Sequence, residues 1–178
     1  MLAETMEILQ RELLKAIGET IQMMIISMVA ALIFGTLLGL VLYITSHPMF
    51  VKNKVINGIA EAVVNVIRSI PFVILMVVCI PLMQALVGTN IGPQAAAIPL
   101  SIAAIAFLAR LVDGAFREVD PGVLEAAFAT GASIPLILKR VLFVEAFPGL
   151  VRAFTVTFVN LVGFSAMAGL VGGGGIGN

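Results

Sequence analysis

An all-α integral membrane protein is predicted by three features of the sequence. Of its 178 residues, 61% are hydrophobic and 11% are charged, against roughly 25% charged residues in soluble domains. Three stretches contain no Asp, Glu, Lys or Arg, and each exceeds the roughly 20 residues that one spanning helix needs; they are residues 20–51, 69–109 and 153–178. Their apolar runs are continuous rather than alternating, which excludes a transmembrane barrel.

Four spanning helices are predicted within these stretches. The middle stretch is long enough for two helices, and the turn-forming residues Gly88, Asn90, Gly92 and Pro93 divide it. The predicted spans are residues 20–43, 69–87, 93–110 and 150–170. The second and third contain prolines, which remove helix hydrogen bonds, so we expect both to be kinked.

Residues 1–19 are predicted to form a separate amphipathic helix on the membrane surface, followed by one membrane domain over residues 20–178. Charged residues recur in the first segment at helical spacing, opposite Leu, Ile and Met. Glutamates replace the basic start of a secretory signal, so the segment is expected to stay on the mature protein. A second amphipathic helix is expected over residues 53–68, leading into the second span.

The basic residues predict the orientation. Eight of the ten fall between spans one and two or between spans three and four: Lys52, Lys54, Arg68, Arg110, Arg117, Lys139, Arg140 and Arg152. By the positive-inside rule these segments face the cytoplasm, so the N-terminus is predicted to lie outside and the loop 111–149 inside.

That loop contains a predicted short helix over residues 121–130. Asp120 suits the N-cap, Pro121 the first helical position and Gly131 a left-handed C-cap. Ten residues span about 15 Å, half of a hydrocarbon core of about 30 Å, so the helix cannot cross. Apart from Glu125 its surface is apolar, including Phe128. It either docks into a groove of a partner protein or rests on lipid.

Little in the sequence favours catalysis. His47 is the single histidine and Cys79 the single cysteine, and neither belongs to a catalytic or metal-ligand cluster. We therefore predict no enzymatic activity, no catalytic residue, no metal site and no nucleic-acid partner. The glycine run 172–175 is predicted to be a flexible turn. No ionisable residue is expected near the middle of the membrane, which disfavours a self-contained channel or ion-coupled carrier.

Several motifs resemble the permease subunits of type I ABC importers. Glu125-Ala126-Ala127, Gly131-Ala132, Val141-Leu142 and the stretch 145–150 are similar to the cytoplasmic EAA loop of that family. Arg68-Ser69-Ile70-Pro71-Phe72 resembles the start of a helix in its amino-acid importers. The stretch 161–169, with the glycine-rich segment after it, is similar to the permease of methionine importers. The likeness runs from about residue 15 to the end.

The resemblance implies a type I ABC importer permease fold and a homodimer that moves methionine, as the D or L form, into the cell. It implies the bacterial cytoplasmic (inner) membrane, an extracytoplasmic substrate-binding protein, and a separate ABC ATPase that holds ATP and Mg²⁺, with no cofactor in this chain. The ATPase would dock on the 121–132 helix. The expected docking residues are Asp120, Pro121, Gly122, Glu125, Ala126, Ala127, Gly131 and Ala132.

One face of the fourth span is a candidate pore or gate. Asn160, Gly163, Phe164 and Met167 recur there at spacings of three and four. Asn160 could bond a passing zwitterion and Met167 could form an apolar plug. Packing between helices around Gly163 would explain the same spacing. In the first span, Gly35-x-x-x-Gly39 would allow another backbone to approach closely.

Two departures from the family pattern lead to further expectations. Val144 stands where the pattern has a proline, so a softer bend is expected before the fourth span. The methionine permeases have a fifth spanning helix after the glycine-rich segment, which this sequence lacks. We therefore expect residues 171–178 to be poorly ordered and transport by this form to be weak. The alternative function is a truncated structural membrane subunit that docks an ATPase without transporting.

Overall fold

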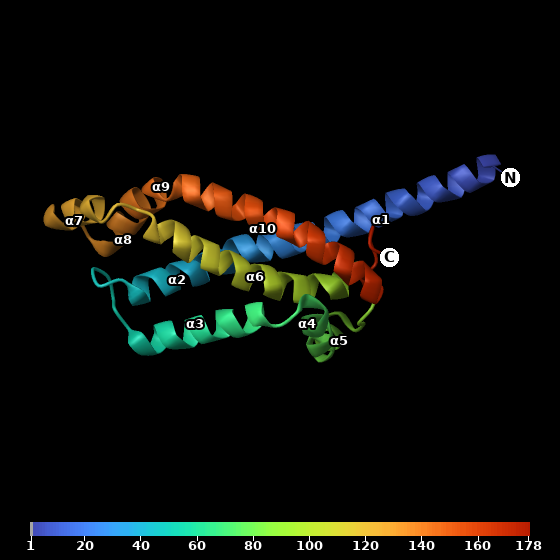
Figure 1. Cartoon of the computed structure of the whole chain (residues 1–178), viewed down its shortest axis with the longest axis horizontal. Helices are drawn as coiled ribbons and strands as arrows, with labels where there is room; N and C mark the ends of the chain where they lie inside the picture. Colours follow the sequence, from blue (N-terminus) through green and yellow to red (C-terminus); the bar gives the residue numbers. More distant parts are fainter. Residues whose placement is uncertain (1) are drawn as a thin grey trace.

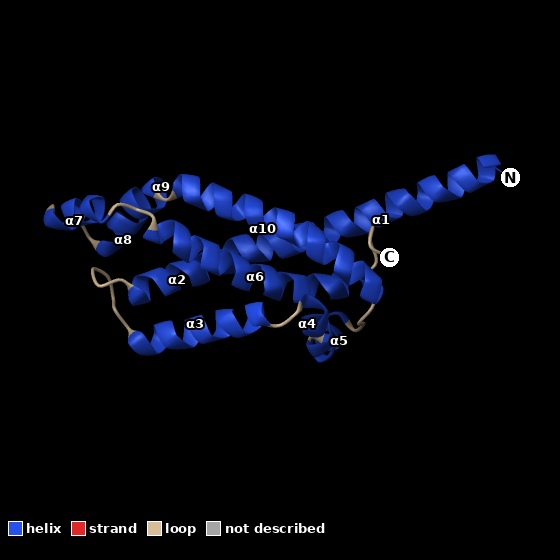
Figure 2. Cartoon of the chain, viewed as in Figure 1, coloured by secondary structure: helices blue, strands red, loops and turns tan. Residues whose placement is uncertain are grey.

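A computed structural model describes the backbone of residues 2–178 and the side chains from Arg11 onward, and throughout this part every regular element is a helix (Figure 2). The elements in chain order are α1 (Leu2–Ala30), the π-helix η1 (Ala31–Gly35), α2 (Thr36–Ser46), α3 (Lys54–Ser69), α4 (Phe72–Val78), α5 (Ile80–Val87), α6 (Pro93–Arg117), α7 (Pro121–Ala129), α8 (Ile134–Ile137), the π-helix η2 (Leu138–Leu142), α9 (Phe143–Glu145), α10 (Phe147–Ala168) and the π-helix η3 (Gly169–Gly173).

The long helices form an elongated bundle with two distinct ends (Figure 1). The α2–α3 connection and the short helices α7, α8 and α9 lie at one end, which we call the docking end. The C-terminus and the α5–α6 turn lie at the other end, where α1 extends beyond the bundle (Figure 1). Three helical segments are long and apolar enough to cross a membrane: Arg11–Ser46, Pro93–Arg117 and Phe147–Gly173. They contain the predicted first, third and fourth spans, so the chain is a multi-pass membrane protein.

The central helix of the bundle is α6, which contacts α1, α2, α3, α5 and α10. Many of its buried residues are alanines, so neighbouring helices can approach it closely. A Cβ on Gly39 would come within 2.6 Å of the Ala109 carbonyl oxygen, and one on Gly35 within 3.1 Å of the Ile105 carbonyl oxygen. The two glycines of the G-x-x-x-G motif are therefore packing positions against α6.

The second span is not the single kinked helix that was predicted. Residues 69–87 form two short helices, α4 and α5, which meet at Cys79. Pro71 precedes α4 and Pro81 lies in the first turn of α5, so each proline begins a helix instead of bending one. The chain instead runs from the docking end along α2 and α6 through α3, and then bends by 109° into α4 (Figure 1).

The predicted amphipathic character of α3 is present, with the polar side facing the bundle. The Asn57 amide donates to the Leu42 carbonyl at 3.0 Å, and Glu61 lies 3.9 Å from Arg110. The exposed side is apolar and comprises Val55, Ile56, Ile59, Val63 and Val66. A helix with apolar residues outside and polar residues inside suits lipid surroundings, where polar groups need partners within the protein.

A separate N-terminal helix is not seen. The helix α1 continues from Leu2 to Ala30 without a break at residue 19. The segment contains no proline, and the single Gly18 costs only about 1 kcal/mol, too little to end a helix. Residues 11–19 are helical, as their periodicity indicates, but they begin the first spanning segment.

The expectation of poor order at residues 171–178 is wrong. The N–H of Gly175 donates to the Glu19 carboxylate at 2.8 Å, and the N–H of Ile176 donates to the Thr20 hydroxyl at 2.9 Å. Gly174 and Gly175 have φ of +74° and +85°, which glycine adopts without steric cost. Here the glycines allow the backbone to approach α1 closely instead of leaving the chain flexible.

Candidate functional site

The short loop helix α7 has the predicted boundaries. The Asp120 carboxylate accepts the Gly122 N–H at 2.7 Å, and Pro121 occupies the first turn. Gly131 follows the helix with φ of +75°. Both ends of α7 therefore carry the local caps that the sequence indicated.

The predicted docking residues divide between two sides of α7. Ala127 and Ala132 pack against the core, and Leu124 is fully buried beneath the helix. Phe128, expected on the surface, is half-buried. The exposed predicted residues are Asp120, Pro121, Gly122, Glu125, Ala126 and Gly131. They present a surface of mainly small side chains at the docking end, on which a partner groove could close.

Aromatic contacts connect α7 to the membrane helices. Phe128 meets Phe50 at 5.5 Å between ring centroids, and Phe50 meets Tyr43 of α2 at 5.8 Å. Tyr43 meets Phe116 of α6 at 5.6 Å, and Phe116 meets Phe143 of α9 at 5.1 Å. Such pairs contribute about 0.5–1.5 kcal/mol each beyond the buried area. These contacts form a continuous series of rings from α7 to the ends of α2 and α6.

A buried carboxylate joins the same helices. Asp113 of α6 is 2% exposed, and it accepts a hydrogen bond from Arg117 at 3.0 Å and from Arg110 at 3.4 Å. Arg117 also donates to the Ser46 hydroxyl at the end of α2, at 2.8 Å. Because a buried carboxylate without partners would be costly, this arrangement holds α2 and α6 in one register.

His47 is a packing residue at the docking end. Its ring lies 5.1 Å from that of Tyr43 and 5.6 Å from that of Phe50, and its Nδ1 accepts the Met49 N–H at 3.4 Å. Burial lowers the pKa of His47 below its usual value, and the nearby Arg117 cation lowers it further. Among the described residues, no group of three His, Cys, Asp or Glu side chains could hold a metal ion.

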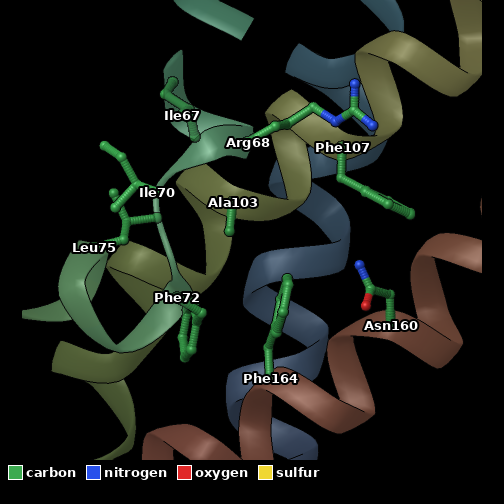
Figure 3. A pocket seen from close by; sticks show the side chains of 9 residues that line it. All are labelled: Ile67, Arg68, Ile70, Phe72, Leu75, Ala103, Phe107, Asn160 and Phe164. Atoms are coloured by element: carbon green, nitrogen blue, oxygen red, sulfur yellow. The ribbon is translucent and has the colours of Figure 1, made fainter. Parts of the chain in front are cut away.

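A cavity of about 210 Å³ lies deeper in the bundle, among α3, α4, α6 and α10 (Figure 3). Four aliphatic residues line it together with Arg68, Phe72, Phe107, Asn160 and Phe164. Its volume is below the about 300–1,000 Å³ of pockets for drug-sized ligands, which suits a small solute. We call it the upper cavity, where upper means farther from the docking end.

Polar groups of the upper cavity gather around one aromatic ring. The Arg68 guanidinium lies over the Phe107 ring at 6.0 Å, and the Asn160 side chain points toward the same ring (Figure 3). Phe72 and Phe164 stack at 4.8 Å between centroids. The site therefore combines a cation and an amide with aromatic walls, which can bind a solute with one charged and one apolar end.

The predicted pore face of the fourth span is divided. Asn160 and Phe164 line the upper cavity, whereas Gly163 and Met167 are exposed on α10. A Cβ on Gly163 would meet nothing within 4 Å, so this glycine does not serve close packing within the chain. Viewed down the helix axis, the four positions spread over about 100°. This arc is wider than the part of a helix that one small cavity contacts.

Sequence reasoning missed Arg68, Phe72 and Phe107. Arg68 was placed in a cytoplasmic segment, but it lies about 21 Å along α3 from Lys54 at 1.5 Å per residue. Arg68 therefore lies far from the start of α3, at the mouth of the upper cavity, and its side chain is exposed in the single chain. The polar residues Asn57 and Glu61, which recur on one side of α3 opposite exposed Val and Ile side chains, could have indicated that this side faces the bundle.

Known proteins share this arrangement. Residues 31–178 match the family model of the binding-protein-dependent transport system inner membrane component. The chain belongs to this permease family. The permease is 44% identical over 166 residues to the probable D-methionine transport system permease protein MetI of Vibrio cholerae, covering 93% of this chain and 74% of the relative. It is 46% identical over 137 residues to the methionine import system permease protein MetP of Bacillus subtilis, covering 77% and 62%.

Solved structures agree with the fold of the permease. An inward-facing conformation of the MetNI methionine ABC transporter matches with a TM-score of 0.92 and 42% identity, covering 96% of this chain and 79% of that chain. An amino acid ABC transporter with histidines matches with a TM-score of 0.78 at 22% identity, which concerns the fold alone. The permease therefore has the type I ABC importer permease fold.

Proposed function

We propose that this permease carries methionine, in its D or L form, into the cell as part of an ATP-driven importer. The observation that carries the proposal is the upper cavity. Its aromatic and aliphatic walls accommodate a thioether side chain, while Arg68 offers a cation to the carboxylate and Asn160 offers hydrogen bonds. The methionine transport names of the relatives support the same substrate.

Energy comes from a separate cytoplasmic ABC ATPase, which holds ATP and Mg²⁺. The permease chain holds no cofactor and catalyses no reaction. The exposed face of α7, including Glu125 and Ala126, docks into a groove of the ATPase. Closure of the ATPase on ATP moves α7, and the aromatic contacts through Phe128 and Phe50 carry that movement to α2 and α6.

A second copy of the chain completes the path, and an extracytoplasmic substrate-binding protein delivers methionine at the opposite end. Gly163 and Met167, exposed on α10, then lie at the contact between the copies, where Met167 forms an apolar gate. Because Met167 is 44% exposed in the single chain, Met167→Ala should alter flux or uncouple ATP hydrolysis without lowering stability. A stability loss with unchanged transport would instead assign Met167 to packing.

In the bacterial inner membrane, the docking end faces the cytoplasm and the N-terminus faces outward. Single cysteines in a Cys79→Ala background test this orientation. Asn90→Cys should react with a membrane-impermeant thiol reagent added outside, and Lys139→Cys should not. Outside labelling of Lys139→Cys would contradict the placement of α7.

Uptake after reconstitution tests the function itself. Vesicles that contain the permease with its ATPase should accumulate labelled methionine only when ATP and the binding protein are present. An ATPase variant that binds ATP without hydrolysing it is the control. A second candidate is a membrane subunit that docks an ATPase through the exposed face of α7 without transporting. Stable copurification without any uptake would select this candidate.

A further inference from the structure

A second cavity, of about 270 Å³, lies between α6 and α10 toward the docking end. We call it the lower cavity. Arg110 and Gly114 of α6, Glu118 directly after α6, and Arg152 and Val156 of α10 line it. A Cβ on Gly114 would meet nothing within 4 Å, so the space beside this glycine is open.

The two cavities follow each other along one groove. On α6, Phe107 lines the upper cavity and Arg110, three residues later, lines the lower one. On α10, Asn160 lines the upper cavity and Val156, four residues earlier, lines the lower one. Residues three or four apart are neighbours on one helix face, so each helix continues from one cavity directly to the next.

Both signs of charge are present in the lower cavity. An Arg152 nitrogen donates to the Glu118 carboxylate at 2.8 Å, and the two side chains are 65% and 63% exposed. Exposed ion pairs are weak because water screens them, so this pair can open readily. A zwitterionic amino acid carries the same two charges. Its carboxylate can replace Glu118 at Arg152 while its ammonium group meets Glu118, with no change in net charge.

The lower cavity also lies at the base of the docking loop. Glu118 directly follows α6 and Arg152 lies near the start of α10, so their ion pair joins the two ends of the loop that contains α7. Close by, a Cβ on Gly149 would come within 3.0 Å of the Ala115 Cβ. If α7 moved relative to the bundle, the shape of the lower cavity would therefore change first, and the upper cavity would be affected only afterwards.

We propose that the lower cavity is a transient binding site for a zwitterionic amino acid on its way from the upper cavity to the cytoplasm, and that the Glu118–Arg152 pair opens to hold it. The inference rests on the proposed function, since it assumes that the permease moves methionine inward.

Filling the lower cavity tests whether it lies on the path. In the complete complex with the ATPase, Gly114→Leu places a side chain in the open space, and uptake of methionine should fall by about tenfold or more. Copurification with the ATPase should stay unchanged. Gly58→Leu is the matched control, because a Cβ on Gly58 of α3 also meets nothing within 4 Å. Normal uptake by Gly114→Leu would overturn the inference.

Ligand protection tests binding without relying on uptake. In a Cys79→Ala background, L-methionine should slow the reaction of Gly114→Cys with a maleimide, whereas methioninamide, which lacks the carboxylate, should not. Adding Glu118→Gln and Arg152→Gln should abolish the protection. Lys139→Gln with Glu145→Gln removes the same charges from exposed positions of the docking loop and should preserve it.

The results separate this inference from the proposed function. An absence of methionine uptake by the unmodified complex contradicts the proposed function, whatever the labelling shows. If the complex transports methionine but the labelling rate of Gly114→Cys is unaffected by it, the lower cavity does not bind the substrate and the inference fails alone.

Discussion

The helices α6 and α10 lie side by side and are both apolar, yet their surroundings differ. In α6, 61% of the most apolar stretch is buried, against 28% in α10. Many buried positions of α6 are alanines. The exposed large residues of α10 are Phe147, Val151, Val156, Phe158, Val159, Val162 and Met167, of which Val156 also lines the lower cavity. Small side chains let α6 be surrounded by other helices, whereas the outer face of α10 has to be covered by lipid or by another chain.

This difference shows that hydrophobicity predicts which segments enter the membrane, while side-chain size decides which of them becomes central. Both cavities lie along the groove between α6 and α10, where each helix contributes small and large residues to the lining.

The largest effect is expected from enlarging a glycine that faces α6. In Gly39→Leu the new Cβ would lie 2.6 Å from the Ala109 carbonyl oxygen and 2.7 Å from the Val112 Cβ. The destabilisation should exceed the about 1–3 kcal/mol of ordinary overpacking, because backbone cannot move aside easily. Gly163→Leu on the open face of α10 is the control. In thermal unfolding in detergent, Gly39→Leu should have the lower midpoint. Equal midpoints for the two variants would contradict the proposed difference in packing between α6 and α10.

A smaller effect, on the affinity for methionine, is expected from Arg68→Gln, beside the α6–α10 groove. Hydrogen bonds to charged groups contribute about 1.5–3 kcal/mol, so the KM for methionine should rise by about tenfold to hundredfold. Complex assembly should be unaffected. Lys52→Gln, which neutralises an exposed lysine in the α2–α3 connection, should leave the KM unchanged. An unchanged KM for Arg68→Gln would exclude carboxylate binding by Arg68.

At the docking end, Gly131→Val should weaken the interaction with the ATPase. A β-branched residue at φ of +75° costs about 1–2 kcal/mol, which displaces the end of α7. Copurification with the ATPase should decrease while membrane insertion is retained. Gly58→Val, at a helical position with open space around it, is the control. Equal copurification of both variants would show that the cap does not position the docking surface.

The smallest effect is expected on the pH dependence of stability, through His47 at the docking end. Because burial lowers the pKa of folded His47, the unfolded chain binds a proton more readily, so His47 should reduce stability as pH falls below about 6.5. Protonation would also remove the Nδ1 acceptor for the Met49 N–H. The Tm of the wild type should therefore fall more than that of His47→Phe between about pH 8 and pH 5. An equal fall in Tm for the wild type and His47→Phe would exclude this effect of His47 on stability.

The membrane class, three of the spanning segments and α7 could all be predicted from the amino-acid sequence. The caps of α7 were predictable because the Asp120–Gly122 hydrogen bond and the left-handed Gly131 involve residues next to the helix. The candidate docking surface followed from these local signals, together with the family resemblance. Of the predicted pore face, only Asn160 and Phe164 reach the upper cavity.

Packing of the whole chain was needed to establish the orientation of α3, the division into α4 and α5, and the contact of Gly175 with Glu19. It also brought Arg68, Phe107 and Asn160 together from three helices that are far apart in the chain. Such contacts depend on how all the helices pack at once. A helical period shows that α3 has a polar and an apolar face, but the surrounding helices and lipid decide which face turns inward.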